Sequence, residues 1–431
     1  MKRSLLGILT VVVISLTACK KNGTDTVTPV VYPDMAEAND PALLFTTSLG
    51  VKVFNGGFGS SVAADPNDPN VFYLMTDRGP NVAGTLANSI ILGKSDFTPS
   101  IGKFRLKDGK LFLEQTIEFK NAAGVKLNGL PNPAGQGATG EIPYDLNGKV
   151  LETSADGIDS EGLVLASDGT FWVSDEYGPH IVHFDANGKT IERINPFGSG
   201  TGGRKIPLVF AKRRANRGME GLTITPDGKT LVGLMQSPMY NPSSAAVSGS
   251  VILRILTFDI ASGATKQYAY VMDNATLTGC SEITALTATT FLTIERDGLY
   301  GGAPTNPAAF KKIFKIDISS ATDISDGANG ANGKLYNGKT VEELKDAAGL
   351  TTAGITPVTK TLVLDLLKDL PTVYPHDKAE GITVIKGNIL VISNDDDFGV
   401  VDNGASGFAQ KLLPASNTID HNRLYFKKLS L

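Results

Sequence analysis

A short two-strand unit recurs along this chain, and the recurrence constrains the fold more than any other feature. In residues 160–179 an acidic residue and a glycine precede an apolar run, an Asp-Gly turn follows, and a second apolar run ends at two acidic residues. Two apolar runs joined by such a turn are typical of a β-hairpin. Similar units cover residues 219–238, 281–298 and 379–399, and a degenerate copy covers residues 61–80. The recurrence predicts a repeat architecture built from hairpins.

These repeats predict an all-β fold of the β-propeller type. A blade of four strands needs about 40–50 residues, so roughly six blades fit the chain. We expect irregular loop insertions between the blades at residues 121–151, 304–312 and 327–350, where the hairpin pattern is lost. The inner strands of a propeller run beside a central channel, so residues at equivalent positions of successive blades would meet at one end of that channel.

The first nineteen residues predict an export signal. Lys2 and Arg3 precede an apolar run, residues 5–16, that is too short to span a membrane as a helix. The run leads into Leu-Thr-Ala-Cys at residues 16–19, which resembles a bacterial lipobox. Cys19 is therefore the expected lipidation site, and the protein would be anchored to a membrane through this lipid alone.

We expect residues 20–40 to form a flexible tether and residues 41–431 to fold. The expected location is the bacterial cell envelope, on its periplasmic or outer side, and the expected state is a monomer. The net charge of −4 argues against a nucleic-acid partner, because such proteins normally carry a basic excess. With Cys19 lipidated, Cys280 has no partner for an internal disulfide and is expected to be a small buried residue.

Glutamates stand at the start of four hairpins, and further acids follow the second strands. The first set would form a ring at one end of the channel: Glu161, Glu220, Glu282 and Glu380. The second set would lie on nearby loops: Asp77, Asp175, Glu176, Glu295 and Asp395. Clustered carboxylates repel one another unless a cation neutralises them, and Ca²⁺ tolerates irregular loops better than Mg²⁺ does. The alternative is that each acid caps a turn through backbone amides.

Arginines are interleaved with these acids in the sequence. Arg78, Arg217 and Arg296 each lie within a few residues of an acid. Guanidinium groups bind phosphate or carboxylate with two parallel hydrogen bonds. A metal held by acids beside an anion held by arginines is the arrangement that phosphoester hydrolysis needs. The alternative is that the arginines pair with acids of the chain and bind no ligand.

Five sequence motifs in order resemble the phytase-like family, exported bacterial proteins described as having an esterase-like activity of phytase. The motifs are TDRGP, SEGL with WVSDEYGP, NRGMEGL with PDGKTL, FLTIERDG, and AEGI with ISNDDDFG, and the likeness extends from about Val51 to the C-terminus. It implies a β-propeller and an exported hydrolase of phosphate or other esters. The second full repeat departs from the acidic pattern, because it ends in Gln236-Ser237-Pro238.

The first hypothesis from the sequence is a Ca²⁺-dependent hydrolase of small anionic esters, above all phosphoesters, with water as the nucleophile. The expected catalytic residues are Glu161, Glu220, Glu380 and His376. The expected substrate-binding residues are Arg78, Arg217, Arg296 and Tyr177. The expected metal ligands are Asp77, Asp175, Glu176, Glu282, Glu295 and Asp395. Two alternatives remain open: a non-catalytic propeller that binds a glycan or a protein, and a metal-dependent lactonase or carboxylesterase similar in layout to the gluconolactonase propellers.

Overall fold

The structure is a computed structural model that describes residues 30–273, 276–277, 279–302, 309–404 and 407–430. The expected export signal, Cys19 and residues 20–29 of the expected tether lie outside the described residues. Contacts within the chain separate Met1–Val31 from Tyr32–Leu431, and the second unit contains the fold. Its first strand is β1 (Met35–Ala38), so the folded unit begins earlier than residue 41 and includes the end of the segment expected as a tether.

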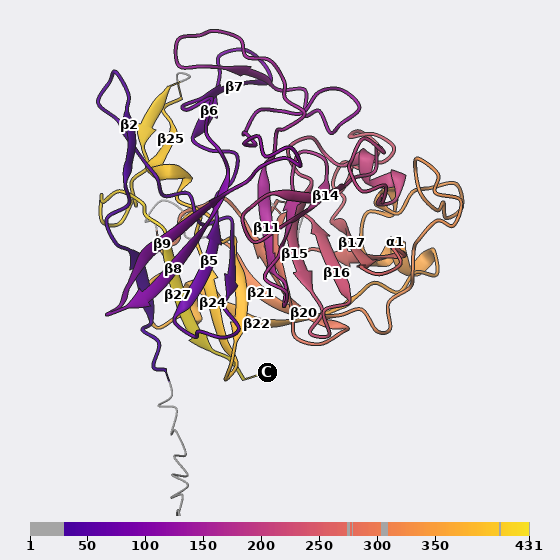
Figure 1. The fold of residues 1–431 in the computed structure, drawn as a ribbon. Coiled ribbons are helices and arrows are strands. Elements are labelled where there is room, and N and C mark those ends of the chain that lie inside the picture. The colour runs from indigo at the N-terminus through magenta and orange to yellow at the C-terminus, as the bar shows by residue number, and fades with distance from the viewer. Residues whose placement is uncertain (1–29, 274–275, 278, 303–308, 405–406, 431) are drawn as a thin grey trace, which may run out of the picture. The chain divides into compact units, whose positions relative to one another are not determined.

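Five blades of four strands make up the body of the described chain (Figure 1). From the inner to the outer strand, blade 1 contains β4 (Ser61–Ala64), β5 (Val71–Met75), β8 (Ser100–Lys107) and β9 (Lys110–Glu118). Blade 2 contains β11 (Ser160–Leu165), β12 (Phe171–Asp175), β13 (His180–Phe184) and β14 (Thr190–Ile194). Blade 3 contains β15 (Met219–Ile224), β16 (Thr230–Met235), β17 (Ile252–Asp259) and β18 (Thr265–Val271).

Blades 4 and 5 complete the ring. Blade 4 contains β19 (Gly279–Ala285), β20 (Thr290–Arg296), β21 (Lys311–Asp317) and β22 (Thr359–Asp365). Blade 5 combines β23 (Ile382–Ile385), β24 (Ile389–Ser393) and β27 (Arg423–Lys428) with the N-terminal strand β1. The inner strands contact one another in the order β4, β11, β15, β19, β23 and back to β4. This closed ring of inner strands makes the described unit a β-propeller, as predicted.

The prediction of about six blades is wrong, because the described chain forms five. The residues counted toward a sixth blade lie instead in connections between strands. One long connection joins β9 to β11 and contains only the short strand β10 (Ile142–Tyr144). Another long one connects β21 to β22 and carries short helical segments rather than strands. Dividing the chain length by the size of a blade therefore overestimated the number of blades.

An apolar cluster lies between each pair of neighbouring blades. Strand β16 shows how the sequence supplies two clusters at once. Leu231 and Met235 pack into the cluster shared with blade 2, and Val232 and Leu234 pack into the cluster shared with blade 4. Successive side chains of a strand point to opposite faces, so a strand buried on both faces needs an unbroken apolar run. This explains why the second strand of each repeat is continuously apolar.

The ring is closed by strands from the two ends of the folded unit. Strand β1 pairs antiparallel with β27, with Met35 opposite Tyr425 and Glu37 opposite Arg423. On its other edge β1 pairs parallel with β9 of blade 1. Just before β1, the ring of Tyr32 stacks on Phe426 with 5.1 Å between centroids. The outer part of blade 5 therefore depends on segments far apart in the chain.

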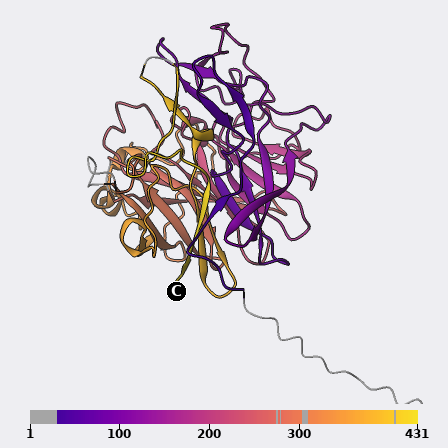
Figure 2. The same cartoon turned by 90° about the vertical axis from the view of Figure 1, so that its left-hand side faces the viewer.

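Three small sheets form a cap at one end of the propeller, above blades 1 and 5 in Figures 1 and 2. They contain β2 (Leu43–Thr46) with β3 (Lys52–Phe54), β6 (Asn81–Ala83) with β7 (Ser89–Leu92) and β10, and β25 (Val400–Asp402) with β26 (Phe408–Gln410). One apolar cluster, which includes Val53, Val82 and Val400, joins the three sheets. Because β6 and β25 follow the second strands of blades 1 and 5, the cap stands at the end of the channel where those strands finish.

The helical segments of the described chain are short: η1 (Leu208–Lys212), η2 (Glu342–Leu344), α1 (Ala347–Thr352), α2 (Leu366–Asp369) and η3 (Asp397–Gly399). The insertion that carries η2 and α1 packs Val341 and Leu350 against Ile252 and Ala269 of blade 3. Within the described residues, no helix has the length and apolar character needed to cross a membrane.

Candidate functional site

A pocket of about 270 Å³ opens on the propeller axis at the end where the cap stands. We call it the axial pocket. All five blades contribute to it, and the lining side chains are all polar or charged: Asp77, Arg78, Asn81, Asp159, Glu161, Glu176, Asn216, Arg217, Glu220, Gln236, Arg296, Lys378, Glu380, Asp395 and Asp397. These include eight carboxylates and four cations. The axial pocket therefore suits charged ligands and offers no apolar wall.

The repeat delivers these side chains to the axis from two positions in each blade. Glu161 and Glu220 are the second residues of the inner strands β11 and β15, and Glu380 lies just before β23. Glu176 and Gln236 follow directly after the second strands β12 and β16. The two strands of a hairpin are antiparallel, so the start of the first lies beside the end of the second. The sequence repeat thus becomes a set of converging polar side chains.

A glycine after the inner-strand glutamate allows the strands to converge. A Cβ atom at Gly162 would lie 2.5 Å from the backbone nitrogen of Leu222 in the next blade. One at Gly221 would lie 2.6 Å from the backbone nitrogen of Ile283. Both distances are too short for a real carbon atom, so only glycine permits this close approach. The Glu-Gly pairs therefore set the narrow width of the ring.

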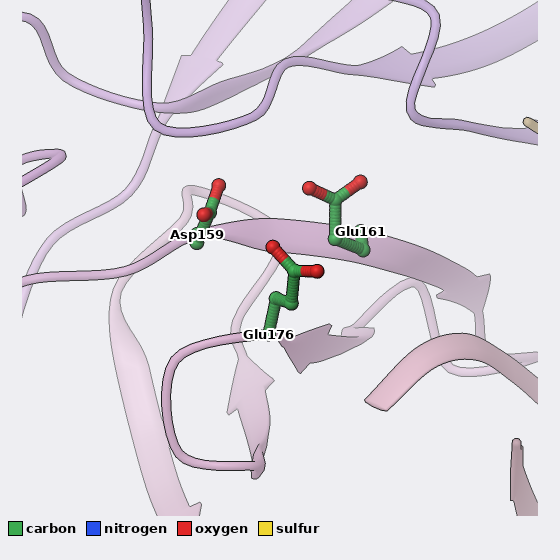
Figure 3. Close-up of side chains that lie close together, drawn as sticks. All are labelled: Asp159, Glu161 and Glu176. Atoms are coloured by element: carbon green, nitrogen blue, oxygen red, sulfur yellow. The ribbon is translucent and has the colours of Figure 1, made fainter. Parts of the chain in front are cut away.

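Three buried carboxylates of blade 2 gather on one side of the axial pocket (Figure 3). One oxygen each from Asp159, Glu161 and Glu176 lies within 4.8 Å of the other two. We call these residues the acidic trio. Burial, followed by the charges of Glu220 and Asp159, raises the pKa of Glu161 well above its usual value. The one ion pair that the described chain makes with the acidic trio joins Arg78 Nε to Asp159 Oδ2 at 3.6 Å, so three carboxylates share a single paired cation.

Gln236 joins the acidic trio to Glu220 of blade 3. Its amide Nε2 donates to Glu176 Oε1 at 3.1 Å and to Glu220 Oε1 at 2.8 Å. The second oxygen of Glu220 is buried and has no hydrogen-bond partner among the described residues. Burial, and then the charge of Glu380, raises the pKa of Glu220 to about 8. A buried polar atom without a partner is costly, so this oxygen points to a ligand that the chain does not supply.

The oxygen donors fit a hard divalent cation. The acidic trio offers carboxylate oxygens only, which are the ligands that Ca²⁺ and Mg²⁺ prefer. Its members carry raised pKa values: that of Asp159 is raised to about 6, chiefly by burial, and that of Glu176 is raised well above its usual value by burial and by Glu220. A bound cation would remove this cost by letting all three carboxylates ionise.

The acids on the opposite side of the axial pocket already have cations. Arg296 of blade 4 pairs with Glu380, and its Nη2 lies 4.0 Å from Glu220 Oε1. Lys378 contacts Asp395 at 2.7 Å and Asp397 at 2.5 Å. Although burial opposes ionisation, Lys378 and then Lys411 hold the pKa of Asp397 below its usual value. The axial pocket is therefore divided into a weakly compensated side at blade 2, where Arg78 pairs with Asp159 alone of the acidic trio, and a compensated side at blades 4 and 5.

The predicted arginines have different partners within the chain. Arg78 donates to Glu141 at 3.0 Å and to Asn216 at 3.1 Å, and its backbone N–H donates to Asp159 Oδ1 at 3.1 Å. The structure therefore gives Arg78 the intramolecular pairing that the sequence left open, and it positions Asp159. Burial, followed by the charge of Arg214, lowers the pKa of Arg217. Arg217 Nη1 donates to Ser237 Oγ at 3.3 Å, and the charges of Glu176 and Glu220 act on its guanidinium in the opposite direction.

The structure does not bring Glu282 into the axial pocket, although it begins the same kind of hairpin. Its Oε1 accepts hydrogen bonds from the backbone N–H groups of Leu222 and Ile283, both at 3.0 Å. Its Oε2 accepts one from the Ser61 hydroxyl of blade 1 at 2.5 Å. Glu282 therefore ties three blades together across the channel, and its oxygens are already used. The expectation that it is a metal ligand does not fit this geometry.

Asp175 and Glu295 also lie outside the axial pocket. Asp175 contacts His180 Nδ1 at 2.6 Å and Arg193 Nη2 at 2.8 Å, which hold the blade 2 strands together. Glu295 pairs with Lys360 at 2.6 Å and accepts a hydrogen bond from the Tyr270 hydroxyl. Both carboxylates were expected to bind metal, and both instead complete buried contacts, Asp175 within blade 2 and Glu295 within blade 4 and with Tyr270 of blade 3. Strand alternation explains this, because in blades 2 and 4 it is the neighbouring residue that faces the axis.

His376 and Tyr177 are buried contacts rather than pocket residues. His376 Nδ1 lies 2.7 Å from Asp420 Oδ1, and its Nε2 lies 2.8 Å from the Tyr425 hydroxyl. Both ring nitrogens are thus used, and His376 does not line the axial pocket. The Tyr177 hydroxyl donates to the Gly129 carbonyl at 2.7 Å. These positions do not fit the catalytic and substrate-binding roles expected from the sequence.

Some pocket residues were missed by the sequence reasoning. Asp159, Lys378 and Asp397 each lie two residues from a predicted site residue: Glu161, Glu380 and Asp395 respectively. Residues two apart in an extended chain point the same way, so this spacing could have identified Asp159 before β11; Asp397 lies in a turn at the start of η3, where that rule does not apply. Gln236 was noticed only as a departure from the acidic pattern. Its function as a bridge between two carboxylates has no sequence signal.

The closed ring with a charged pocket on its axis defines the class as a β-propeller with an acidic axial site. A model of the phytase-like family, described as "esterase-like activity of phytase", matches residues 54–398, so this chain belongs to that family. A relative described as an uncharacterized secreted protein from Arthroderma benhamiae is 28% identical, and the match covers 70% of each chain.

Solved structures with similar arrangements of strands have low sequence identity to this chain. A protein from Lactobacillus plantarum matches with 10% identity and a TM-score of 0.36, covering 91% of this chain and 98% of that one. The WD40 domain of Toxoplasma gondii coronin matches with 9% identity and a TM-score of 0.34, covering 92% of this chain and 77% of that one. The assignment of the fold rests on the ring of inner strands and the closure by β1 described above.

Proposed function

We propose that this chain is an exported hydrolase of phosphoric esters that uses a divalent cation, Ca²⁺, bound by the acidic trio. The description of its family supports hydrolysis of an ester, and the secreted relative supports export. The observation that carries the proposal is the division of the axial pocket. On one side three carboxylates share one paired cation, Arg78, and on the other side Arg296 and Lys378 pair with the acids. A metal and an anionic substrate would complement these two sides.

In this proposal Asp159, Glu161 and Glu176 hold the cation, with Arg78 positioning Asp159 and Gln236 positioning Glu176. A cation bound there would polarise a phosphoryl oxygen and lower the pKa of a water molecule. Arg217 and Arg296 would bind the remaining phosphoryl oxygens and offset the charge that develops on them. These residues fix the phosphorus atom between the two sides of the axial pocket.

Glu220 is the proposed proton donor to the departing alcohol. Its pKa of about 8 means that the carboxyl carries a proton at neutral pH, and its Oε2 has no other partner in the described chain. Water would attack the phosphorus atom, the bond between phosphorus and the alcohol oxygen would break, and that oxygen would take the proton from Glu220. The proton released by the attacking water would then return to Glu220, so that alcohol and inorganic phosphate leave and the enzyme is unchanged. A group with a pKa near the working pH is suited to this transfer.

The test is a hydrolysis assay of the purified protein on a panel of phosphate monoesters and diesters. We expect turnover with Ca²⁺, loss of turnover after chelation, and loss in Glu161→Gln. The matched control is Glu152→Gln, which removes an exposed carboxylate outside the axial pocket. Turnover that survives both chelation and Glu161→Gln would contradict the proposal. Hydrolysis of lactones with no turnover of phosphoesters would favour the lactonase alternative instead.

We further propose that Cys19 anchors the exported protein through a lipid. The support is the lipobox-like sequence before Cys19 and the secreted relative. Mass spectrometry of the mature N-terminus should find a lipid-modified Cys19, and Cys19→Ala should release the protein from the membrane fraction. An unmodified N-terminus at another residue would overturn the anchor without affecting the proposed chemistry.

A further inference from the structure

Arg78 lies between two carboxylates that come from different parts of the chain. One is Asp159 of the acidic trio, and the other is Glu141, which stands just before β10 in the connection between β9 and β11. Arg78 Nη1 donates to Glu141 Oε2 at 3.0 Å and to Oε1 at 3.2 Å. Arg78 Nε lies 3.6 Å from Asp159 Oδ2, which is too far for a hydrogen bond. The guanidinium therefore binds Glu141 more closely than it binds Asp159.

Two asparagines support this orientation of the guanidinium. Asn216 Oδ1 accepts a hydrogen bond from Arg78 Nη1 at 3.1 Å, and Asn81 Oδ1 accepts one from Nη2 at 3.2 Å. Glu141 is held in turn, because Thr139 Oγ1 donates to its Oε2 at 2.9 Å. In the described chain, none of the hydrogen bonds made by the two outer nitrogens of Arg78 goes to the acidic trio.

The arrangement leaves one oxygen of Asp159 available. Its Oδ1 accepts a hydrogen bond from the backbone N–H of Arg78 at 3.1 Å, whereas its Oδ2 accepts none from the described residues. A guanidinium hydrogen-bonded to Oδ2 would compete with a cation for that oxygen, because charge-assisted pairs of this kind are strong. Glu141 supplies Arg78 with another carboxylate and so reduces the competition.

We propose that Glu141 is a positioning residue that sets the cation affinity of the acidic trio by holding the Arg78 guanidinium away from Asp159. This inference rests on the proposed function, because it requires a divalent cation at the acidic trio. Glu141 does not line the axial pocket, so it acts through Arg78 and not as a ligand. The long connection between β9 and β11 thereby contributes to the site as well as to the cap.

The test is calorimetric titration of the full-length protein with Ca²⁺. Glu141→Gln keeps the shape of the side chain and removes its charge, which leaves Asp159 as the carboxylate paired with Arg78. The affinity for Ca²⁺ should fall about 10-fold, the lower end of the usual effect of losing a residue that supports a ligand. Arg78→Met removes the competing cation, so adding Glu141→Gln to that variant should change the affinity no further. The matched control is Glu152→Gln, an exposed glutamate of the same connection.

The two backgrounds separate positioning from simple attraction of the cation by the charge of Glu141. An equal loss of affinity with and without Arg78 would overturn the inference, and so would an unchanged affinity in Glu141→Gln alone. Should Arg78→Met fail to fold, titrations of Glu141→Gln at low and high salt replace it. Attraction at a distance is screened by salt, so a loss that disappears at high salt would overturn the inference, whereas competition from a buried pair should persist.

The same titrations distinguish failure of this inference from failure of the proposed function. Ca²⁺ binding that is lost in Glu161→Gln but unchanged in Glu141→Gln would overturn the inference and leave the proposed function standing. A full-length protein that binds no Ca²⁺ would overturn both.

Discussion

Blades 2 and 5 both place glutamates at the axial pocket, but the chain treats the two differently. Glu380 of blade 5 pairs with Arg296, and its neighbour Asp397 contacts Lys378. Glu161 of blade 2 has no cation or donor in the described chain, and burial raises its pKa. A buried carboxylate remains ionised only where a cation accompanies it. The comparison teaches that the distribution of cations, rather than the number of acids, marks the metal side.

On the compensated side a second lysine, Lys411, pairs with Asp377 and Asp397. Lys411 is fully buried and lies 2.8 Å from Asp377 and 2.7 Å from Asp397. Burial alone would lower the pKa of Lys411, but the surrounding carboxylates, Asp377 first, raise it well above its usual value. The acidic trio, in contrast, has one paired cation among its described neighbours, Arg78, which lies 3.6 Å from Asp159.

The largest expected effect is the loss of calcium binding in Glu161→Gln. Removing one ligand should weaken the affinity for Ca²⁺ by at least about 100-fold, which exceeds the usual effect of losing a residue that only supports a ligand. Calorimetric titration with Ca²⁺ measures this, with Glu152→Gln as the control. A Glu161→Gln protein that binds Ca²⁺ as tightly as the unmodified chain would remove the basis of the comparison.

Arg296→Met should turn the compensated side into an uncompensated one. Breaking a buried ion pair leaves Glu380 without a cation, so the free energy of unfolding should fall by about 3 kcal/mol without metal. Added Ca²⁺ should restore part of this loss, because Glu380 would then offer a second position for the cation. Urea unfolding with and without Ca²⁺ measures both effects. If Arg296→Met unfolds at the same urea concentration as the unmodified protein without metal, the ion pair of Arg296 with Glu380 does not make the compensated side different from the blade 2 side.

The metal-free protein should become less stable as the pH rises. Burial raises the pKa values of Asp77 and Glu220 to about 8, whereas carboxyls in the unfolded chain titrate near pH 4. Between about pH 4 and pH 8 the folded state therefore binds more protons than the unfolded state. Their contribution to stability is complete below about pH 4 and is lost as the pH rises to about 8.

Burial also raises the pKa values of the acidic trio, so these carboxyls add to the same pH dependence. Saturating Ca²⁺ should reduce the dependence by replacing the protons of the acidic trio, while Asp77 and Glu220 keep theirs. The free energy of unfolding, measured in urea from pH 5 to pH 8 with a chelator or with Ca²⁺, provides the comparison. Stability that increases with pH in the chelated protein would contradict the prediction, because it would mean that these carboxyls are ionised without a cation.

The smallest expected effect is that of Glu380→Gln on calcium affinity. Because Arg296 already pairs with Glu380, the substitution should change the affinity for Ca²⁺ by less than about 3-fold. The same calorimetric titration applies, and the ratio of the Glu161→Gln effect to the Glu380→Gln effect measures how sharply the axial pocket is divided. Equal losses in the two variants would mean that the cation contacts both sides.

The hairpin repeat predicted the fold well, because a strand buried on both faces leaves an unbroken apolar run in the sequence. Phe171-Trp172-Val173 shows such a run, and the structure places it in β12 of blade 2. The convergence of Glu161, Glu220 and Glu380 followed from the same repeat. The number of blades did not follow, because connections such as the one between β21 and β22 use many residues without adding a strand to the ring.

The identity of each acid's partner could not be predicted from the repeat. Glu282 has the same place in its hairpin as Glu220, but the backbone amides of two neighbouring strands and Ser61 of blade 1 take up its oxygens. Ser61 comes from a segment more than two hundred residues away in the chain. Such contacts depend on which blades meet when the ring closes. The sequence pattern within one hairpin therefore does not predict them.

Closure of the ring at blade 5 depends on strand β27, which pairs with both β1 and β24. Strand β27 provides the surface on which both β24 and β1 pair, and its six residues are Arg423–Lys428. A polypeptide shortened before this segment would leave β1 and β24 with unpaired edges and blade 1 without its neighbour. Synthesis, and any transport across a membrane, must therefore deliver β27 before the ring can close.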